Sequence, residues 1–208
     1  MARLSLSDID AFKVVDDETG ETFYGCNQDW YGSDWQRLSG CGPSVVAGIL
    51  MYLRRDIAVP EVKCKKYAIS FMEEVWEYVT PTQRGIHTAE MLQTRVVLYC
   101  AAKNLKVASA VCGIPEERAL RPQMERIWAY MTDALSRNIP IAFLNLHNGE
   151  EENLDEWHWV TVVSAERSGR NGNVEIGILD RGRALAVNLS LWLDTTDYGG
   201  GFVHFSVT

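Results

Sequence analysis

The sequence predicts an α+β fold, in which helices come first along the chain and an antiparallel sheet follows. Apolar residues recur every three to four positions over residues 68–79 and 120–135, which is the spacing of one helix face. Beyond Pro140 the pattern changes to short runs of β-branched and aromatic residues, separated by turn-forming clusters. Because helices and strands are segregated along the chain, a doubly wound parallel sheet is not expected.

The helical part spans about residues 41–138. Helices are predicted at about residues 41–54, 68–79, 88–103 and 120–135. The first of them is apolar on nearly every side, as expected of a helix buried in the middle of the fold. A short strand is predicted at 105–112, between the last two helices.

The sheet part spans about residues 139–208. Strands are predicted at residues 141–146, 158–163, 174–179 and 201–207. Residues 185–194 are predicted to form a further strand that enters a short helix or loop. With 208 residues, of which 47 % are hydrophobic, the chain has enough apolar material for one sizeable core. We therefore expect a single domain over residues 1–208.

The charge and the longest apolar run limit the possible partners. The chain carries a net charge of −8, from 20 Lys and Arg against 28 Asp and Glu. Binding to nucleic acid or to an anionic membrane surface relies on excess positive charge, so neither is expected. The longest apolar run, residues 45–53, is about half of the roughly 20 residues that cross a bilayer. The first ten residues include two aspartates where a signal peptide is apolar, so we expect a cytoplasmic protein.

The cysteines match neither a disulfide framework nor a zinc site. They lie at Cys26, Cys41, Cys64, Cys100 and Cys112. Their number is odd, and no two of them form a CxxC pair. We therefore expect reduced thiols, and neither a bound metal nor another cofactor.

Cys41 has the surroundings of a nucleophile. It lies between Gly40 and Gly42, which allow a tight turn, directly ahead of the apolar helix. Pro43 follows at a position that the first turn of a helix tolerates. At a helix N-terminus the exposed backbone N–H groups and the helix dipole favour the thiolate, which is the reactive form of cysteine. None of the other cysteines has this setting.

His158 and Asp180 form a candidate base and its orienting group. If the strands at 158–163 and 174–179 form a hairpin with its turn centred on Gly169, residues whose numbers sum to 338 face each other, and His158 faces Asp180. Opposed Cβ atoms are about 4.5–5.5 Å apart, so the carboxylate can accept a hydrogen bond from the imidazole. In the competing interpretation Asp180 only turns the chain, and His158 only packs between two tryptophans.

Together these residues resemble papain-like cysteine peptidases, and within them the bacterial branch related to the double-glycine leader peptidases. That branch has a glutamine, then Gly-Cys-Gly-Pro opening a buried helix, later a histidine that begins a strand, and an aspartate after the next strand. The matching stretches are residues 27–30, 40–43, 158–162 and 178–182. The resemblance implies a papain-like fold, with the nucleophile helix packed on the antiparallel sheet.

The resemblance also implies a role for each residue. Cys41 attacks a carbonyl carbon, His158 removes the thiol proton and later protonates the leaving amine, and Asp180 holds the imidazole. A glutamine side chain and the backbone N–H of the nucleophile stabilise the oxyanion. Gln28, thirteen residues before Cys41, fits the branch with a long preceding loop and is preferred. Gln36, five residues before, has a spacing nearer to that of papain and stays the alternative.

We therefore expect a hydrolase that cleaves a peptide or other amide bond of a peptide or protein substrate. An acyl transferase or a deamidase can use the same residues. From other classes, the alternatives are a catalytically silent peptide-binding module and a metal site at Cys41, His158 and Asp180, which offers only three ligands and no spacing signature. The sequence shows no transporter or ATP-binding segment, so cleavage of an exported leader peptide is not implied.

Overall fold

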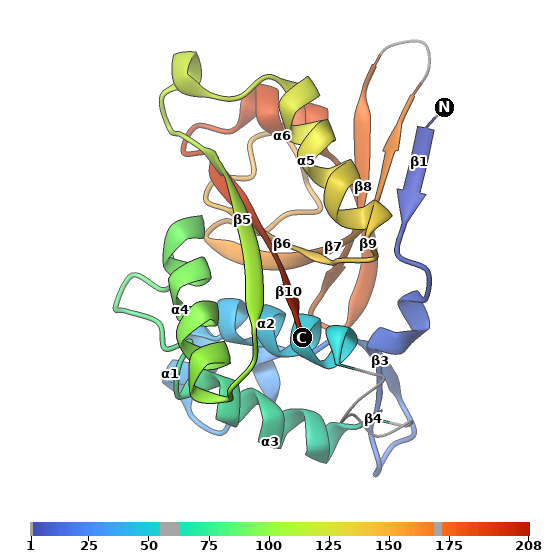
Figure 1. Ribbon diagram of the computed structural model, residues 1–208, viewed down its shortest axis with the longest axis vertical. Helices are drawn as coiled ribbons and strands as arrows, with labels where there is room; N and C mark the ends of the chain where they lie inside the picture. The colour runs from blue at the N-terminus through green and yellow to red at the C-terminus, as the bar shows by residue number, and fades with distance from the viewer. Residues whose placement is uncertain (1, 55–62, 169–171) are drawn as a thin grey trace.

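The computed structural model describes residues 2–54, 63–168 and 172–208, and its centre is a seven-stranded antiparallel sheet (Figure 1). The strands are β1 (Ala2–Ser5), β5 (Val107–Ile114), β6 (Ile141–Asn145), β7 (His158–Arg167), β8 (Val174–Asp180), β9 (Arg183–Asn188) and β10 (Gly200–Val207). Their order is β5-β10-β6-β7-β8-β9, and β1 pairs with the C-terminal half of β7. With 38 % helix and 30 % strand, the predicted α+β class is confirmed.

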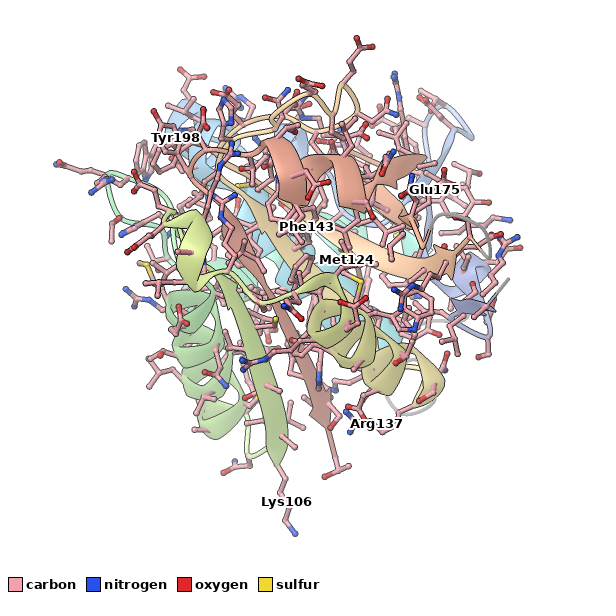
Figure 2. All side chains as sticks on the ribbon, turned by 90° about the horizontal axis from the view of Figure 1, so that it is seen from above. Lys106, Met124, Arg137, Phe143, Glu175 and Tyr198 are labelled. Atoms are coloured by element: carbon pink, nitrogen blue, oxygen red, sulfur yellow. The ribbon has the colours of Figure 1, made fainter. Side chains whose placement is uncertain are left out.

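Helices cover both faces of this sheet. One layer contains α2 (Cys41–Leu53), α3 (Lys65–Trp76) and α4 (Ala89–Ala102), and the other contains α5 (Met124–Ser136) and α6 (Leu189–Thr195). Alternate residues of β6 enter the two cores, as the pleat of a strand requires. Ile141 and Phe143 pack with α5 and α6, whereas Ala142 and Leu144 pack with α2, α3 and α4. Phe143 accordingly lies near the centre of the view in Figure 2.

The helix α2 is the most deeply buried element. Each of its residues from Gly42 to Tyr52 is buried, which agrees with the apolar character that the sequence shows on nearly every side. It packs mainly across β7, and also against α3 and β6. This packing brings its N-terminus to the end of the sheet where β7 begins. In the described part of the chain, no helix is both long and apolar enough to span a membrane.

The first 40 residues contain small elements that the sequence pattern does not predict. These are β2 (Lys13–Val15) and β3 (Thr22–Tyr24), the 3₁₀ helices η1 (Ile9–Phe12) and η2 (Gln28–Trp30), and α1 (Asp34–Ser39). Together with β4 (Lys63–Cys64), β2 and β3 form a second sheet of three strands. The Tyr24 N–H donates to the carbonyl oxygen of Gly182 at 2.7 Å, which ties this small sheet to the turn between β8 and β9.

Two predicted boundaries differ from the structure. The strand predicted at 105–112 appears as β5, two residues later in the chain, and it pairs with β10 at the edge of the main sheet. The helix predicted from residue 120 begins only at Met124, because Leu120 ends the 3₁₀ helix η3 (Arg118–Leu120). Pro122 then has no backbone N–H to continue a helix.

The predicted register of the β7–β8 hairpin is wrong by two residues. Thr161 pairs with Leu179 and Val162 with Ile178, so the numbers sum to 340 rather than 338. A bulge between Val162 and Ser164 then shifts the register once more. The turn centre predicted at Gly169 lies outside the described residues. Because the side-chain period of a strand is two, a shift of two residues leaves the side chains between the start of β7 and the bulge on their predicted face. Beyond the bulge the shift is three residues, so the predicted pairing of faces is lost there.

Candidate active site

The position of Cys41 depends on the short helix that precedes it. α1 begins with a capping box, in which the Ser33 side chain accepts the Gln36 backbone N–H and the Gln36 side chain accepts the Ser33 backbone N–H. Gly40 separates α1 from α2, and a Cβ atom at this position would lie 2.7 Å from the ring of Tyr31. The close approach of Tyr31 therefore requires glycine here, and Cys41 becomes the first residue of α2.

His158 and Asp180 form a buried pair at the adjacent ends of β7 and β8. The Nε2 atom of His158 lies 2.6 Å from Oδ1 of Asp180, and the two side chains are only 7 % and 12 % exposed. Because the observed register offsets the two residues diagonally by two positions, they meet through their side chains rather than as directly opposed Cβ atoms. The structure therefore brings together the pair that the sequence predicts, in a different register.

The electrostatics of His158 favour its protonated form. Burial lowers the pKa of the imidazole, but hydrogen bonds to Asp180 and Cys41, together with the negative charges of these groups, raise it to about 10. Since Nε2 faces Asp180, the ring nitrogen that remains for the Cys41 sulfur is Nδ1. An imidazolium held in this way can stabilise a thiolate at Cys41.

The residues beside His158 and Asp180 have unusual backbone conformations. Trp157 has a φ of 54° and Arg181 a φ of 43°, in the left-handed region that residues other than glycine and asparagine seldom adopt. Each is held by a neighbour: the Arg84 guanidinium lies 5.9 Å from the Trp157 ring centroid, and Arg181 Nη1 lies 2.9 Å from Asp155 Oδ2. Such strain persists where the surrounding structure imposes it, and it often occurs at functional sites.

Only one of the two candidate glutamines, Gln28, lines the cavity that contains Cys41, His158 and Asp180. The Nε2 atom of Gln28 donates to the carbonyl oxygen of Arg37 at 2.7 Å, which leaves its second N–H free to point elsewhere. Its buried Oε1 has no hydrogen-bond partner among the described residues. Gln36 is committed to the α1 capping box and donates through Nε2 to Glu73 Oε2 at 2.6 Å.

Three hollows meet around Cys41 and Asp180. A narrow cavity of about 20 Å³ is lined by Cys41, His158, Asp180 and Gln28, among others. A cleft of about 430 Å³, here called the Trp157 cleft, touches Cys41 but neither His158 nor Asp180. A groove of about 410 Å³ touches Asp180 but not Cys41. A chain that crosses Cys41 can therefore pass from the cleft to the groove.

The tryptophan next to His158 joins the catalytic strand to the cleft. Trp159 is buried, and its Nε1 donates to the carbonyl oxygen of Ile86 at 2.6 Å. This bond holds the loop 83–87 against the start of α2. No local sequence signal predicts this contact, because Trp159 and Ile86 lie 73 positions apart.

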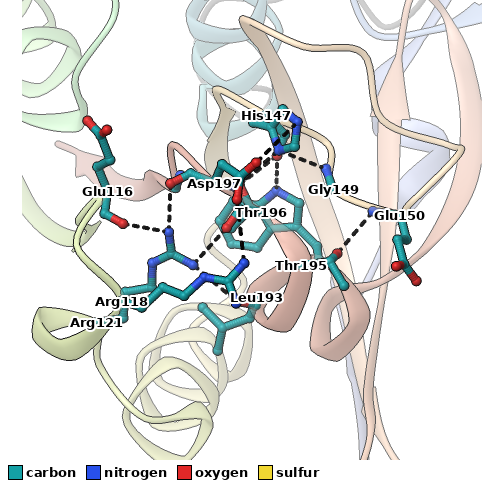
Figure 3. A network of polar contacts seen from close by, with 12 residues as sticks. Glu116, Arg118, Arg121, His147, Gly149, Glu150, Leu193, Thr195, Thr196 and Asp197 are labelled. Carbon is teal, nitrogen blue, oxygen red and sulfur yellow. Dashed lines mark hydrogen bonds and ion pairs between the residues drawn. The ribbon is translucent and has the colours of Figure 1, made fainter.

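A polar network follows the end of β6 in the chain (Figure 3). The guanidinium of Arg121 donates to several backbone carbonyl oxygens, including those of Pro115, Thr196 and Asp197 at 2.8–2.9 Å. His147 Nδ1 accepts the backbone N–H of Asp197 at 3.0 Å. His147 directly follows Leu146, which lines the cleft, so the network restrains the chain next to that residue.

The other four cysteines differ from Cys41. Burial raises the pKa of Cys26 to about 12, and it also raises the pKa of Cys100 and of Cys112. The prediction that Cys41 alone lies at a helix N-terminus is wrong, because Cys64 is the N-cap of α3 and its sulfur accepts the backbone N–H of Tyr67. Among the described residues, no group of three or more His, Cys, Asp or Glu side chains is arranged to hold a metal ion.

The order of helices and strands, with a thiol at the start of a buried helix packed on an antiparallel sheet, defines a papain-like fold. A solved structure with this fold, UfSP from C. elegans, a cysteine protease, superposes with a TM-score of 0.55. The alignment covers 100 % of this chain at 9 % identity, and the chain spans 34 % of the length of the UfSP chain. At this identity the likeness shows the fold.

Comparisons at the level of sequence add no closer relative. No family model matches the chain, and no curated protein matches it. The expected membership of the double-glycine branch therefore stays a prediction, while the expected papain-like fold is confirmed.

Proposed function

We propose that this protein is a cysteine hydrolase that cleaves a peptide or other amide bond through a thioester acyl-enzyme. The observation that carries the proposal is the buried His158–Asp180 pair, 2.6 Å apart, in one cavity with the Cys41 thiol. If the His158–Asp180 hydrogen bond had only a structural role, it would need no thiol beside it. A thiol at the start of a buried helix, in contact with the same imidazole, supplies the nucleophile that a hydrolase requires.

Before the attack, Nδ1 of His158 has already taken the proton of the Cys41 thiol, so that a thiolate lies beside an imidazolium. In the acylation step this thiolate attacks the carbonyl carbon of the substrate. A C–S bond forms as the carbonyl π electrons move onto oxygen. The C–N bond of the tetrahedral intermediate then breaks, and the imidazolium gives its proton to the leaving amine. The high pKa of His158 supports this sequence, because the imidazole keeps the proton until the amine departs.

The oxyanion of the intermediate requires donors that are already in place. We assign this role to the second Nε2 hydrogen of Gln28 and to the backbone N–H of Cys41. The bond from Gln28 to the Arg37 carbonyl oxygen supports the assignment, because it restrains the amide. In the deacylation step His158 takes a proton from water, and the hydroxide attacks the thioester carbonyl carbon. The C–S bond then breaks, and Cys41 leaves as a thiolate beside the His158 imidazolium, which restores the starting pair.

An acyl transferase or a deamidase would use the same first step. A transferase passes the acyl group to a nucleophile other than water, and a deamidase releases ammonia from a carboxamide. The products therefore distinguish both activities from the cleavage of a peptide bond. A catalytically silent peptide-binding module would keep the cleft and lose turnover.

The test is to incubate the wild-type protein and the Cys41→Ala variant with a peptide library and to identify products by mass spectrometry. We expect cleaved peptides with the wild-type protein only. With hydroxylamine present, hydroxamate products in place of free acids identify a thioester that other nucleophiles can reach. Cleavage that persists in Cys41→Ala would contradict the proposal. Peptide binding by both proteins with cleavage by neither would identify the silent module.

A further inference from the structure

The Trp157 cleft combines an apolar floor with a cationic end. Ile86, Leu144 and Leu146 line its floor, and Trp35, Leu38 and Trp157 stand at its rim. Arg84 and His87 supply its polar groups together with Gln83, and the described lining contains neither Asp nor Glu. In a chain with a net charge of −8, a cleft without a single acidic side chain is a local reversal of the overall charge.

The rim of the cleft exposes an unusual amount of apolar surface. Leu38 is 76 % exposed, Trp157 is 47 % exposed and Trp35 is 43 % exposed. Grouped apolar side chains of this size on a surface indicate a binding site. They fit a substrate segment that carries a large apolar side chain.

The polar groups of the cleft have unused hydrogen-bonding capacity among the described residues. In the part of the chain that the structure describes, the guanidinium of Arg84 has no carboxylate partner, and its recorded contact is the face of the Trp157 ring. Nδ1 of His87 is buried without a hydrogen-bond partner there. A guanidinium offers five donors in a planar fork that matches a carboxylate, so an anionic group of a ligand is the natural complement of Arg84.

The position of the cleft shows which part of a substrate enters it. The leaving amine must reach His158 to be protonated, so it departs on the side where His158 and Asp180 lie. The Trp157 cleft touches Cys41 but neither of these residues, whereas the groove beside Asp180 does not touch Cys41. The acyl portion, which stays bonded to the Cys41 sulfur, therefore occupies the Trp157 cleft.

We infer that the protein acts on peptides whose acyl side carries a large apolar side chain next to an acidic one, with the apolar group on the floor of the Trp157 cleft and the carboxylate on Arg84. This inference rests on the proposed function, since it names the substrate class of the same site. The groove beside Asp180 gives no such preference, because it contains Arg181 and Arg183 together with several carboxylates.

The test uses peptidyl acyloxymethyl ketones, from which a thiolate displaces the acyloxy group as a carboxylate while a C–S bond forms. Four probes carry Leu-Glu, Leu-Gln, Glu-Leu or Gln-Leu before the reactive ketone. The rate of Cys41 labelling is followed by peptide mass spectrometry. For one of the two residue orders, we expect the probe with Glu to label Cys41 about tenfold faster than the probe with Gln. This ratio corresponds to the free energy of one hydrogen bond to a charged group.

Variants of two arginines separate recognition from general charge. Arg84→Gln is expected to abolish the preference for Glu over Gln. Arg126→Gln removes the same charge from exposed surface on α5 and is expected to keep the preference. Equal rates for Glu and Gln probes in both orders, with Cys41 still labelled ahead of the other cysteines, would overturn the substrate inference and leave the hydrolase proposal intact. Labelling of Cys41 no faster than that of Cys64 would overturn the hydrolase proposal itself.

Discussion

At the scale of single residues, the environment of His158 explains most of the proposed chemistry. The candidate residues Cys41, His158, Asp180 and Gln28 each carry a local signal, such as glycines around a cysteine or a polar residue at a strand end. Such signals select Cys41, His158 and Asp180 from the sequence, whereas the selection of Gln28 depends on the family resemblance and leaves Gln36 as the alternative. Arg84 and Trp157 carry no such signal, because their place beside Cys41 depends on the bond between Trp159 and Ile86, two residues distant in the chain.

Replacing Asp180 by Asn is expected to lower the pKa of His158. The wild-type imidazolium should keep its proton until the pH rises through about 10, since Asp180 and Cys41 stabilise the charge. The amide of Asn carries no charge and stabilises the imidazolium less. Titration of the His158 ring signals by NMR measures the difference. Asp155→Asn, which removes the carboxylate paired with Arg181, is the control and should leave the titration unchanged. An unaltered His158 titration in Asp180→Asn would refute the assigned role.

The same shift has a consequence for stability. A pKa raised from 6.5 to about 10 means that the native state holds a proton that the unfolded state has lost. This contribution is complete below about pH 6.5 and disappears as the pH rises through about 10. The free energy of unfolding of wild type should therefore fall over this range by more than that of His158→Gln.

Replacing Gln28 by Ala is expected to lower kcat about 10²–10³-fold and to change KM little, because an oxyanion donor acts in the transition state. Gln36→Ala should instead leave kcat unchanged and lower the free energy of unfolding by about 1 kcal/mol, through loss of the α1 capping box. Hydrolysis of an activated ester measures both constants. A large loss of kcat in Gln36→Ala and none in Gln28→Ala would reverse the assignment of the two glutamines.

At the scale of elements, periodicity predicts long helices and strands well and short elements poorly. The apolar helix at 41–54 appears as α2, and the four strands predicted after residue 139 appear as β6, β7, β8 and β10. β2 and β3 have only three residues each, too few for a periodic pattern to develop. The β7–β8 register was already wrong on the turn side of the bulge, where the numbers of paired residues sum to 341 rather than 338. The bulge inserts one unpaired residue and changes the sum to 340, and nothing in the strand sequence marks its position.

The α1–α2 junction should be sensitive to one added methyl group. Gly40→Ala would place a Cβ atom 2.7 Å from the Tyr31 ring, so the junction must shift. We expect a loss of about 1–3 kcal/mol in the free energy of unfolding, together with slower alkylation of Cys41. Gly32→Ala is the matched control, since a Cβ atom there meets nothing within 4 Å. Urea denaturation and iodoacetamide kinetics test both effects, and equal behaviour of the two variants would show that the junction is not tightly packed.

At the scale of the whole molecule, the two helical layers are joined to one sheet, and polar groups are buried where they meet it. His204 on β10 is buried beneath α5, where Tyr130 Oη accepts its backbone N–H and Asp133 Oδ2 lies 3.9 Å from its Nε2. Burial, aided by the charge of Arg137, lowers the pKa of its imidazole. The interface between α5 and the sheet therefore contains a histidine, His204, that is harder to protonate in the folded state than in the unfolded chain.

The free energy of unfolding should consequently fall as the solution is acidified below about pH 6.5, where the unfolded chain takes up a proton before native His204 does. His204→Gln cannot take up this proton. Its loss of stability between pH 7 and pH 5, measured by urea denaturation, is expected to be smaller than that of wild type. An equal loss in both proteins would show that His204 is protonated as readily in the folded state.

The measurement that tests the central claim most directly is the alkylation rate of each cysteine by iodoacetamide against pH, followed by peptide mass spectrometry. Cys26, Cys64, Cys100 and Cys112 serve as internal controls. An activated pair predicts that Cys41 reacts fast well below the reference thiol pKa of about 8.5, and that His158→Ala slows it while near-UV circular dichroism stays native. If Cys41 in the folded protein reacts like the other four, the thiol and the imidazole do not act together, and the hydrolase account is contradicted.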